Sequence, residues 1–592
     1  MTVQTIPDLF LHAVTAYDKA DAFQYKKGGV YVSVSHRDML TAVEKATRGI
    51  LASKLVKGDR IALLSENRLE WAIADLAIVS AGCVNVPIYA TLPANQVRFI
   101  LEDSEARAVF VSNKEQFDKI RAVRDRLPHL LRVFSFDPIE GEPDVTTLGD
   151  LMMDGTKIDN KSTYERRIKT VDTNDWASII YTSGTTGEPK GAILTHGNFV
   201  AAALGAEAVF KLGYEDRCLS FLPLSHVFER SAGFYAMLYL GVTIAYAESF
   251  DTIGENMLEV QPTLMISVPR LYEKIYARIL DNVTASSALK KHLFFWAVEV
   301  GRRYVRERLE KRVRLYTGLR YRLADRLVFR KLKARTGGKL RFFVSGGAPL
   351  ARDIAEFFYA VGLPILEGYG LTETSAITSV NIFSAFKFGT IGRPVPGVEA
   401  RIAEDGEILR KGPTVTQGYF KKPDLTKEAI KDGWFYTGDI GYIDNDGFLV
   451  ITDRKKDIIV TSVGKNVAPH PIESLLKTSK YISQAVVIGN NRKFVSAIIV
   501  PNFDNLTAFA DAAGIPYKNY SELVRDPAVI KKIGDEIDRK SEHLAGFERI
   551  KKFSLLDRDF SIENDELTPT LKVKRRTIEK KFQGEIDSLY TS

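Results

Sequence analysis

The chain has 592 residues and a formal net charge of +8, and 45% of its residues are hydrophobic and 26% charged. These proportions are typical of a globular protein and exclude a disordered or a membrane-spanning chain. The length exceeds one ordinary hydrophobic core and predicts at least two domains. The two cysteines, Cys83 and Cys218, are too few for a disulfide framework or a zinc site, which favours a reducing, cytoplasmic location.

Neither a secretory signal nor a membrane helix is expected. Residues 1–20 lack a basic patch followed by an apolar run. The longest apolar stretch without a charge, residues 231–247, is shorter than the roughly 20 residues that a membrane helix needs. This stretch also contains glycines and tyrosines, so we expect it to form helix and strand in a buried core.

Four segments share a pattern in which a short apolar run leads into a Gly-, Ser- or Thr-rich turn and then a helical or looser stretch. They are residues 176–187, 263–279, 340–362 and 363–375. Apolar strands that feed loops and helices predict an α/β fold with parallel-rich sheets. Ligands of such sheets gather beyond the carboxyl ends of the strands.

Residues 285–341 are strongly basic. They include 18 lysines and arginines against four acidic residues, a local charge of +14, so the rest of the chain is net acidic by about six charges. Apolar residues recur among the arginines at helical spacing, and one interpretation is a solvated helical hairpin. A second is peripheral contact with an anionic membrane face, because basic amphipathic helices partition at interfaces. Nucleic-acid binding is a third, but no nucleic-acid fold signature accompanies the charge, and we expect no such partner.

The pattern changes after about residue 450. Two predicted strands, 484–489 and 495–501, are followed by helices, which indicates a small α+β domain. The charged run 453–457 separates it from the preceding chain. We therefore expect an N-terminal domain at 1–452, a hinge at 453–457 and a mobile C-terminal domain at 458–592.

The stretch "YTSGTTGEPKGAILTH", residues 181–196, combines glycines, hydroxyls and one lysine. It is not the common nucleotide P-loop, which requires G-x-x-x-x-G-K-[ST]. The chemistry is nevertheless similar, because glycines let backbone N–H groups approach an anion while hydroxyls and Lys190 add hydrogen bonds and charge. A mobile surface turn is the alternative, and the composition of the stretch does not exclude it.

Five further motifs follow in order along the chain. They are "SGGAPL" (345–350), "GYGLTET" (368–374), "GWFYTGDIG" (433–441), "DRKKDIIVTSVGKNVAPHPIE" (453–473) and "LTPTLKVKRR" (567–576). With residues 181–196 they resemble the adenylate-forming superfamily, which comprises acyl-CoA synthetases, firefly-type luciferases and peptide-synthetase adenylation domains. Residues 66–82 are similar to the N-terminal part of that family.

The resemblance implies a reaction in two steps. A carboxylate attacks the α-phosphate of ATP, pyrophosphate leaves, and the acyl-adenylate then reacts with CoA. Phosphoryl chemistry of this kind depends on positioning and charge neutralisation more than on a protein nucleophile. The resemblance implies that the outer phosphates of ATP are held by Thr182, Ser183, Gly184, Thr185, Thr186, Gly187 and Lys190.

The remaining motifs imply the rest of the nucleotide site. Tyr369 and Gly370 on one side, and Gly347, Ala348 and Pro349 on the other, would hold adenine. Asp439 and Arg454 would contact the ribose, and Thr372 the α-phosphate. Glu373 would bind Mg²⁺, since a carboxylate suits a hard cation. His226 would lie where the acyl substrate and the phosphate channel meet, although a lone histidine beside apolar residues is more often structural.

The C-terminal motifs imply a domain that moves. Lys572 would polarise the substrate carboxylate; Lys574 is the alternative, because the glycine that usually precedes the catalytic lysine of the family is Leu571 here. The pivot would be Lys456. Rotation about it would remove the lysine and bring Gly464 to the site, where CoA passes closely.

Three features resemble the long-chain acyl-CoA synthetase subgroup: the forms of 453–457 and 467–473, the segment 329–350, and the basic insertion before it. We therefore expect a long-chain fatty-acid–CoA ligase that uses ATP, Mg²⁺ and CoA. A fatty acyl-AMP ligase that loads a carrier protein, and a non-catalytic lipid-binding or uptake protein of the same fold, are the alternatives. The sequence does not specify an oligomeric state.

Overall fold

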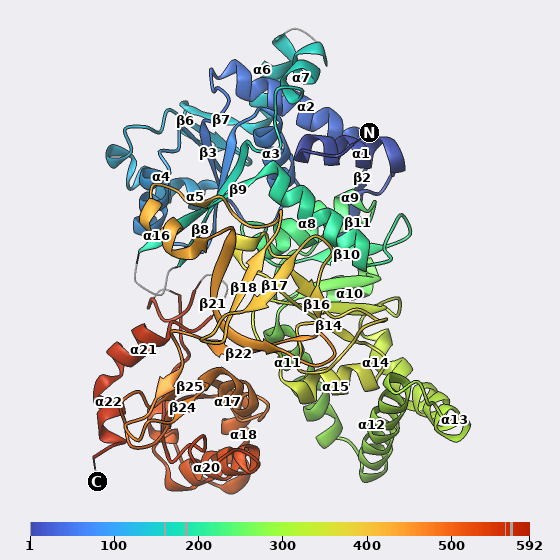
Figure 1. The fold of residues 1–592 in the computed structure, drawn as a ribbon, viewed down its shortest axis with the longest axis vertical. Helices are drawn as coiled ribbons and strands as arrows, with labels where there is room; N and C mark the ends of the chain where they lie inside the picture. Colours follow the sequence, from blue (N-terminus) through green and yellow to red (C-terminus); the bar gives the residue numbers. More distant parts are fainter. Residues whose placement is uncertain (1, 159–160, 184–187, 563, 569–571, 592) are drawn as a thin grey trace.

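The computed structural model describes residues 2–158, 161–183, 188–562, 564–568 and 572–591. Its N-terminal part contains three sheets, and a smaller part that begins after β22 lies below it in Figure 1. This arrangement confirms the expected α/β class with a small C-terminal α+β domain.

The first sheet is built from the apolar runs of residues 60–195 and one later two-residue strand, in the order β19-β9-β8-β4-β3-β5-β6-β7. Its strands are β3 (Arg60–Leu64), β4 (Val84–Ile88), β5 (Ala108–Val111), β6 (Arg132–Ser135), β7 (Val145–Thr147), β8 (Trp176–Ser183), β9 (Pro189–Thr195) and β19 (Gly418–Tyr419). From β8 through β4, β3, β5 and β6 to β7 the pairing is parallel, whereas β8, β9 and β19 pair antiparallel.

A hairpin replaces the looser stretch that the sequence pattern predicted after residues 176–187. β9 pairs along β8, with Ile180 opposite Ala192 and Thr182 opposite Lys190. The apolar run after Gly191 forms a strand because it completes a buried face beside β8. Lys190 is therefore held by a strand and not by a free loop.

The second sheet has nine strands in the order β16-β15-β14-β13-β12-β10-β11-β1-β2. They are β1 (Phe23–Lys27), β2 (Val30–Val34), β10 (Arg217–Ser220), β11 (Thr243–Tyr246), β12 (Leu264–Ser267), β13 (Phe342–Ser345), β14 (Ile365–Tyr369), β15 (Ser379–Val380) and β16 (Arg393–Pro394). From β1 to β14 all neighbours are parallel. Residues 231–247 form the buried π-helical turn η2 (Glu229–Ala236), α9 (Met237–Tyr239) and β11, as expected.

The third sheet is antiparallel and leads to the predicted hinge. Its strands are β17 (Glu399–Ile402), β18 (Glu407–Lys411), β20 (Ile430–Lys431), β21 (Trp434–Ile443) and β22 (Leu449–Arg454). β21 and β22 place Asp439 directly opposite Arg454. A turn at residues 455–457 follows.

Helices cover the N-terminal sheets and separate their strands (Figure 1). They are α1 (Ile6–Tyr17), α2 (His36–Ala52), α3 (Leu69–Ser80), α4 (Ala94–Asp103), α5 (Lys114–Arg121), η1 (Arg124–Arg126), α6 (Leu148–Lys157), α7 (Lys161–Ile168), α8 (His196–Val209), α10 (Ile253–Val260), α11 (Pro269–Thr284), α12 (Ala288–Leu309), α13 (Leu315–Ala324), η3 (Asp325–Phe329), α14 (Arg330–Ala334), α15 (Arg352–Ala360), η4 (Thr372–Thr374) and α16 (Pro423–Ala429).

The basic segment forms the helical hairpin of α12 and α13, which projects from the body at the lower right of Figure 1. Among the residues that the structure describes, no helix is long and apolar enough to cross a membrane.

The C-terminal domain surrounds its own core of Val487, Ile499, Leu506 and Ile533. Its elements are β23 (Ile459–Val460), β24 (Asn466–Val467), α17 (Pro469–Leu476), β25 (Ile482–Ile488), β26 (Ser496–Pro501), α18 (Phe503–Ala513), α19 (Tyr520–Leu523), α20 (Pro527–Ser541), β27 (Lys552–Leu555), α21 (Arg575–Lys581) and α22 (Gln583–Ser588). β25 and β26 are the two strands that the sequence predicted.

Candidate active site

A cavity of about 2680 Å³ lies between the N-terminal sheets and the C-terminal domain. It opens at the carboxyl ends of β13 and β14, where the parallel sheet was expected to place its ligands. Fourteen of the predicted site residues line it: Thr182, Lys190, His226, Gly347, Ala348, Pro349, Tyr369, Gly370, Thr372, Glu373, Asp439, Arg454, Lys456 and Lys572.

The remaining predicted residues do not line this cavity or lie outside the described structure. Gly184, Thr185, Thr186 and Gly187 lie outside the described residues, and Ser183 is described only through its backbone pairing with Pro189. Gly464 lies in the turn between β23 and β24 and is absent from the cavity lining. Its φ of +74° favours glycine, and no heavy atom lies within 4 Å of the position that a Cβ would take.

Lys190, Tyr419 and Glu373 form a compact polar group on the cavity wall. The Lys190 ammonium donates a hydrogen bond of 2.5 Å to the Tyr419 hydroxyl and lies 3.4 Å from Glu373 Oε1. The same hydroxyl donates to Glu373 Oε1 at 2.8 Å. Burial, and then the charge of Glu373, raise the pKa of Tyr419, so its phenol stays protonated and can donate. The group offers one cation and one carboxylate to a phosphate–metal complex.

Tyr369, Asp439 and Arg454 form a second group. The Tyr369 hydroxyl donates to Asp439 Oδ2 at 2.5 Å, and Arg454 Nε lies 3.3 Å from Asp439 Oδ1. Burial raises the pKa of Asp439, while Arg454 and Tyr369 act in the opposite direction. Arg454 and Tyr369 therefore hold a buried carboxylate at the cavity wall, where it can accept hydrogen bonds from vicinal hydroxyls.

Two glycines shape the wall beside these groups. A Cβ on Gly370 would lie 1.8 Å from the carbonyl oxygen of Ala376, so no larger residue fits there. Gly347 has a φ of +80°, which favours glycine in the turn after β13. Both positions let the backbone approach a flat ligand closely.

Lys572 reaches the cavity from the C-terminal domain. Its side chain is exposed to the cavity. Desolvation by the cavity walls, and then the charge of Arg454, lower the pKa of Lys572 to about 8, while Asp439 acts in the opposite direction. Lys574 also lines the cavity, but its ammonium pairs with Asp565 at 2.5 Å within its own domain.

His226 lies close enough to Lys572 to be affected by its charge. Burial, and then Lys572, lower the pKa of His226 to about 3, so the imidazole is neutral near pH 7. Its Nδ1 accepts a hydrogen bond of 3.1 Å from the Phe228 backbone N–H. His226 therefore offers Nε2 to the cavity as a neutral polar group, and nothing in this arrangement requires it to transfer a proton.

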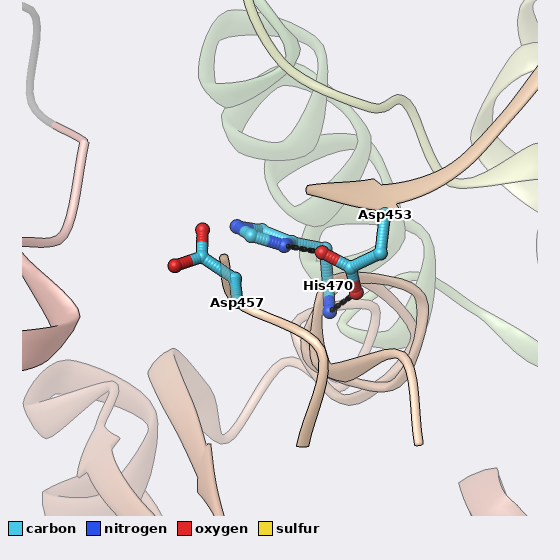
Figure 2. A group of neighbouring side chains, drawn as sticks. All are labelled: Asp453, Asp457 and His470. Atoms are coloured by element: carbon cyan, nitrogen blue, oxygen red, sulfur yellow. Dashed lines mark hydrogen bonds and ion pairs between the residues drawn. The ribbon is translucent and has the colours of Figure 1, made fainter. Parts of the chain in front are cut away.

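A hydrogen-bonded pair spans the predicted hinge. Figure 2 shows Asp453, from the end of β22, against His470 on α17. Asp453 Oδ1 lies 2.6 Å from His470 Nδ1, and Asp453 Oδ2 accepts from the His470 backbone N–H at 3.2 Å. Asp457 completes a cluster whose ligand atoms lie within 4.8 Å of one another. Both Asp453 oxygens already accept hydrogen bonds from His470. These bonds satisfy the buried carboxylate, so its position does not require a bound cation.

Tyr419, which lines the cavity, and Arg410, which lies behind Tyr369, were not predicted from the sequence. Tyr419 belongs to none of the motifs, and only its pairing through β19 with β9 brings it to Lys190. Arg410, on β18, is fully buried with its guanidinium 5.3 Å from the Tyr369 ring centre, and it donates to Ser379 at 3.1 Å. Neither residue has a spacing signal that could have identified it.

Comparison with known proteins agrees with this geometry. The family model described as AMP-binding enzyme matches residues 10–420, and the model for the C-terminal domain of AMP-binding enzymes matches residues 456–592. The chain is 38% identical over 568 residues to the long-chain-fatty-acid–CoA ligase FadD15 of Mycobacterium bovis, covering 95% of this chain and 93% of that protein. It is 32% identical to the long-chain-fatty-acid–CoA ligase ACSBG2 of Rattus norvegicus, covering 100% and 93%.

A solved structure shares the fold. The adenylation domain of a carboxylate reductase from Mycobacterium chelonae superimposes with a TM-score of 0.78 at 21% identity, over 99% of this chain and 91% of that one. The cavity between the two domains, which Lys572 of the smaller one lines, is the candidate active site. The chain belongs to the AMP-binding enzyme family, and within it to the AMP-forming acyl-CoA ligases.

Proposed function

We propose that the protein is a long-chain fatty-acid–CoA ligase, which converts a fatty acid, ATP and CoA into acyl-CoA, AMP and pyrophosphate. One observation carries the proposal: Lys572 of the C-terminal domain reaches the same cavity as Asp439, Arg454, Lys190 and Glu373 of the N-terminal sheets. The relatives named long-chain-fatty-acid–CoA ligases support a long-chain fatty acid as the substrate.

In the first half-reaction, a carboxylate oxygen of the fatty acid attacks the α-phosphorus, and the bond to pyrophosphate breaks. Lys572 orients the carboxylate and offsets charge at the reacting centre, while Thr372 contacts the α-phosphate. Lys190 holds the outer phosphates, and Asp439 accepts hydrogen bonds from the ribose hydroxyls. Charge stabilisation of this kind needs no protein nucleophile.

Magnesium fits the site only together with the nucleotide. Mg²⁺ is usually held by one or two carboxylates plus phosphate oxygens and water. Glu373 supplies one carboxylate at the cavity wall, already accepting a hydrogen bond from Tyr419. Glu373 is therefore the residue that would hold the ion, with the phosphates completing its ligands, and the ion would neutralise phosphate charge.

In the second half-reaction, the CoA sulfur attacks the acyl carbonyl and AMP leaves. Rotation about Lys456 is proposed to withdraw Lys572 and to bring Gly464 to the cavity. The acyl chain is proposed to occupy the apolar part of the wall. That part includes Phe210, Leu212, Met237, Leu264, Ile266 and Phe342. The substrate is proposed to arrive from a membrane surface that the basic segment contacts.

The test measures pyrophosphate release with saturated acids from short to long, each with and without CoA, and identifies the products by mass. CoA-dependent turnover that peaks with long chains and yields acyl-CoA supports the proposal. Accumulation of acyl-adenylate that ignores CoA would indicate an acyl-AMP ligase. No turnover with any acid would leave the non-catalytic alternative.

A further inference from the structure

The outward face of α13 and the adjoining η3 is both apolar and cationic. Leu315, Leu319 and Leu323 are 82%, 54% and 49% exposed. Their spacing of four residues places them in one row along the helix. The opposite face, with Thr317, Ala324 and Phe329 among others, is buried against the body. The leucine row is therefore not part of the core.

Arginines flank the leucine row. Arg312, Arg322 and Arg326 are exposed, and among the described residues none of these three side chains forms an ion pair. Three acids lie near these arginines: Glu310 is exposed, and the other two are engaged by other cations. Glu307 pairs with Arg303 at 3.2 Å, and Asp325 pairs with Lys333 at 2.5 Å. The face therefore has a net positive charge beside its apolar row.

The hairpin is held together by packing between its two helices. Tyr304 of α12 stacks on Tyr321 of α13 with ring centres 4.0 Å apart, and Arg320 lies 5.7 Å from the Trp296 ring centre. Figure 1 shows both helices projecting from the body, away from the C-terminal domain. The leucine row therefore lies on the outside of a packed helical hairpin. None of its three leucines lines the active-site cavity.

We propose that this face, defined by Leu315, Leu319, Leu323, Arg312, Arg322 and Arg326, docks the protein onto an anionic phospholipid surface. Helices of this composition lie in the membrane interface, with apolar side chains at the acyl boundary and basic ones at the headgroups. A nucleic acid would engage the arginines but leave the leucines in water, so the combination favours lipid. These six residues specify the membrane contact of the proposed function. The contact itself does not depend on the ligase chemistry.

Vesicle co-sedimentation of the full chain tests the leucines. The probes are phosphatidylcholine vesicles with and without phosphatidylglycerol. Leu315→Gln, Leu319→Gln and Leu323→Gln combined are expected to weaken binding to the anionic vesicles by about tenfold or more. The matched control combines Leu131→Gln, Leu204→Gln and Leu258→Gln, which are also exposed but lie elsewhere, and is expected to bind as the wild type does.

A second pair of variants tests the charges. Arg312→Gln, Arg322→Gln and Arg326→Gln combined should weaken anionic-vesicle binding by about tenfold or more and reduce its salt dependence. The control with the same charge change combines Arg126→Gln, Arg132→Gln and Lys427→Gln on other exposed surfaces. Thermal midpoints and turnover of a water-soluble acid without vesicles show that each variant is folded and separate this inference from the proposed function.

Equal losses in a test set and its control, or no loss in either test set, would overturn the proposal. So would a wild-type protein that binds neither vesicle, or one that binds an RNA oligonucleotide more tightly than anionic vesicles. Turnover without vesicle binding would overturn this inference alone. Vesicle binding without turnover would overturn the proposed function alone.

Discussion

Asp453 and His470 are hydrogen bonded across the predicted hinge, at 2.6 Å between Asp453 Oδ1 and His470 Nδ1 (Figure 2). Asp453 is the second-to-last residue of β22, and His470 lies on α17 of the C-terminal domain. The contact spans the turn in which Lys456 is the proposed pivot. It therefore stabilises the arrangement in which Lys572 reaches the cavity.

Replacing His470 by Ala should weaken that arrangement. We expect adenylate formation to slow roughly fivefold, the effect of about one hydrogen bond, with little change in thioester formation. Single-turnover measurements of the two half-reactions check this, with His129→Ala, at an exposed histidine of the N-terminal domain, as control. Equal slowing of both half-reactions would show that the pair supports the fold in general.

The same pair should make stability depend on pH. Burial lowers the pKa of His470, but the hydrogen bond to Asp453 and the charge of Glu473 outweigh it and raise the pKa overall. A raised pKa gives stability that is complete below the unfolded value, about 6.5, and is lost as the pH rises through the folded value. The Tm difference between wild type and His470→Ala should therefore be larger at low than at high pH. A difference independent of pH would contradict this.

Tyr419→Phe should impair nucleotide use without unfolding the protein. The change removes the hydrogen bond of 2.8 Å to Glu373, the proposed Mg²⁺ ligand. We expect the KM for ATP in pyrophosphate exchange to rise roughly fivefold, most clearly at limiting Mg²⁺. Tyr442→Phe, at an exposed position of β21, is the control. An unchanged KM for ATP would mean that the Tyr419 hydroxyl does not contribute to nucleotide binding.

The pH profile of kcat/KM for ATP should report Lys572. Its pKa of about 8 means that the ammonium form is lost above that pH, so kcat/KM should fall there. Lys572→Arg keeps its charge throughout this range and should remove the decline, whatever its absolute rate. A wild-type profile that stays flat well above pH 8 would argue against a charged Lys572 in the free enzyme.

Gly370→Ala should destabilise the protein and distort the nucleotide wall. The new Cβ would meet the Ala376 carbonyl oxygen at 1.8 Å, so the backbone must shift. We expect a loss of about 2 kcal/mol in the free energy of unfolding, measured by denaturant titration. Gly254→Ala, in open space on α10, should be neutral or stabilising. Equal effects of the two changes would show that the close contact does not set the stability.

The sequence motifs predicted most of the residues that line the cavity, but not the strand pairings that bring further residues to its wall. The motifs that resemble the adenylate-forming superfamily pointed to Asp439, Arg454 and Glu373, and all three line one cavity. Tyr419 could not be found in this way. It reaches Lys190 only because the two-residue strand β19 adds to β9, a pairing between segments far apart in the chain.

Other features also depend on packing that no local pattern encodes. The run 189–195 becomes a strand because β8 offers it a partner. The apolar residues of 315–323 have helical spacing in the sequence, but packing such as that of Tyr304 on Tyr321 decides which face is left outward. The sequence pattern leaves the choice between Lys572 and Lys574 open, and the two differ in the structure because only Lys574 is paired with Asp565.

The central claim is that one cavity serves both half-reactions and that Lys572 acts only in the first. Its most direct test compares Lys572→Ala with Lys574→Ala in two single-turnover reactions: acyl-adenylate formation from acid and ATP, and thioester formation from supplied acyl-adenylate and CoA. We predict that Lys572→Ala slows adenylate formation by about a hundredfold or more and leaves thioester formation nearly intact, with Lys574→Ala close to wild type in both. Normal adenylate formation by Lys572→Ala, or equal loss of both half-reactions, would contradict the account.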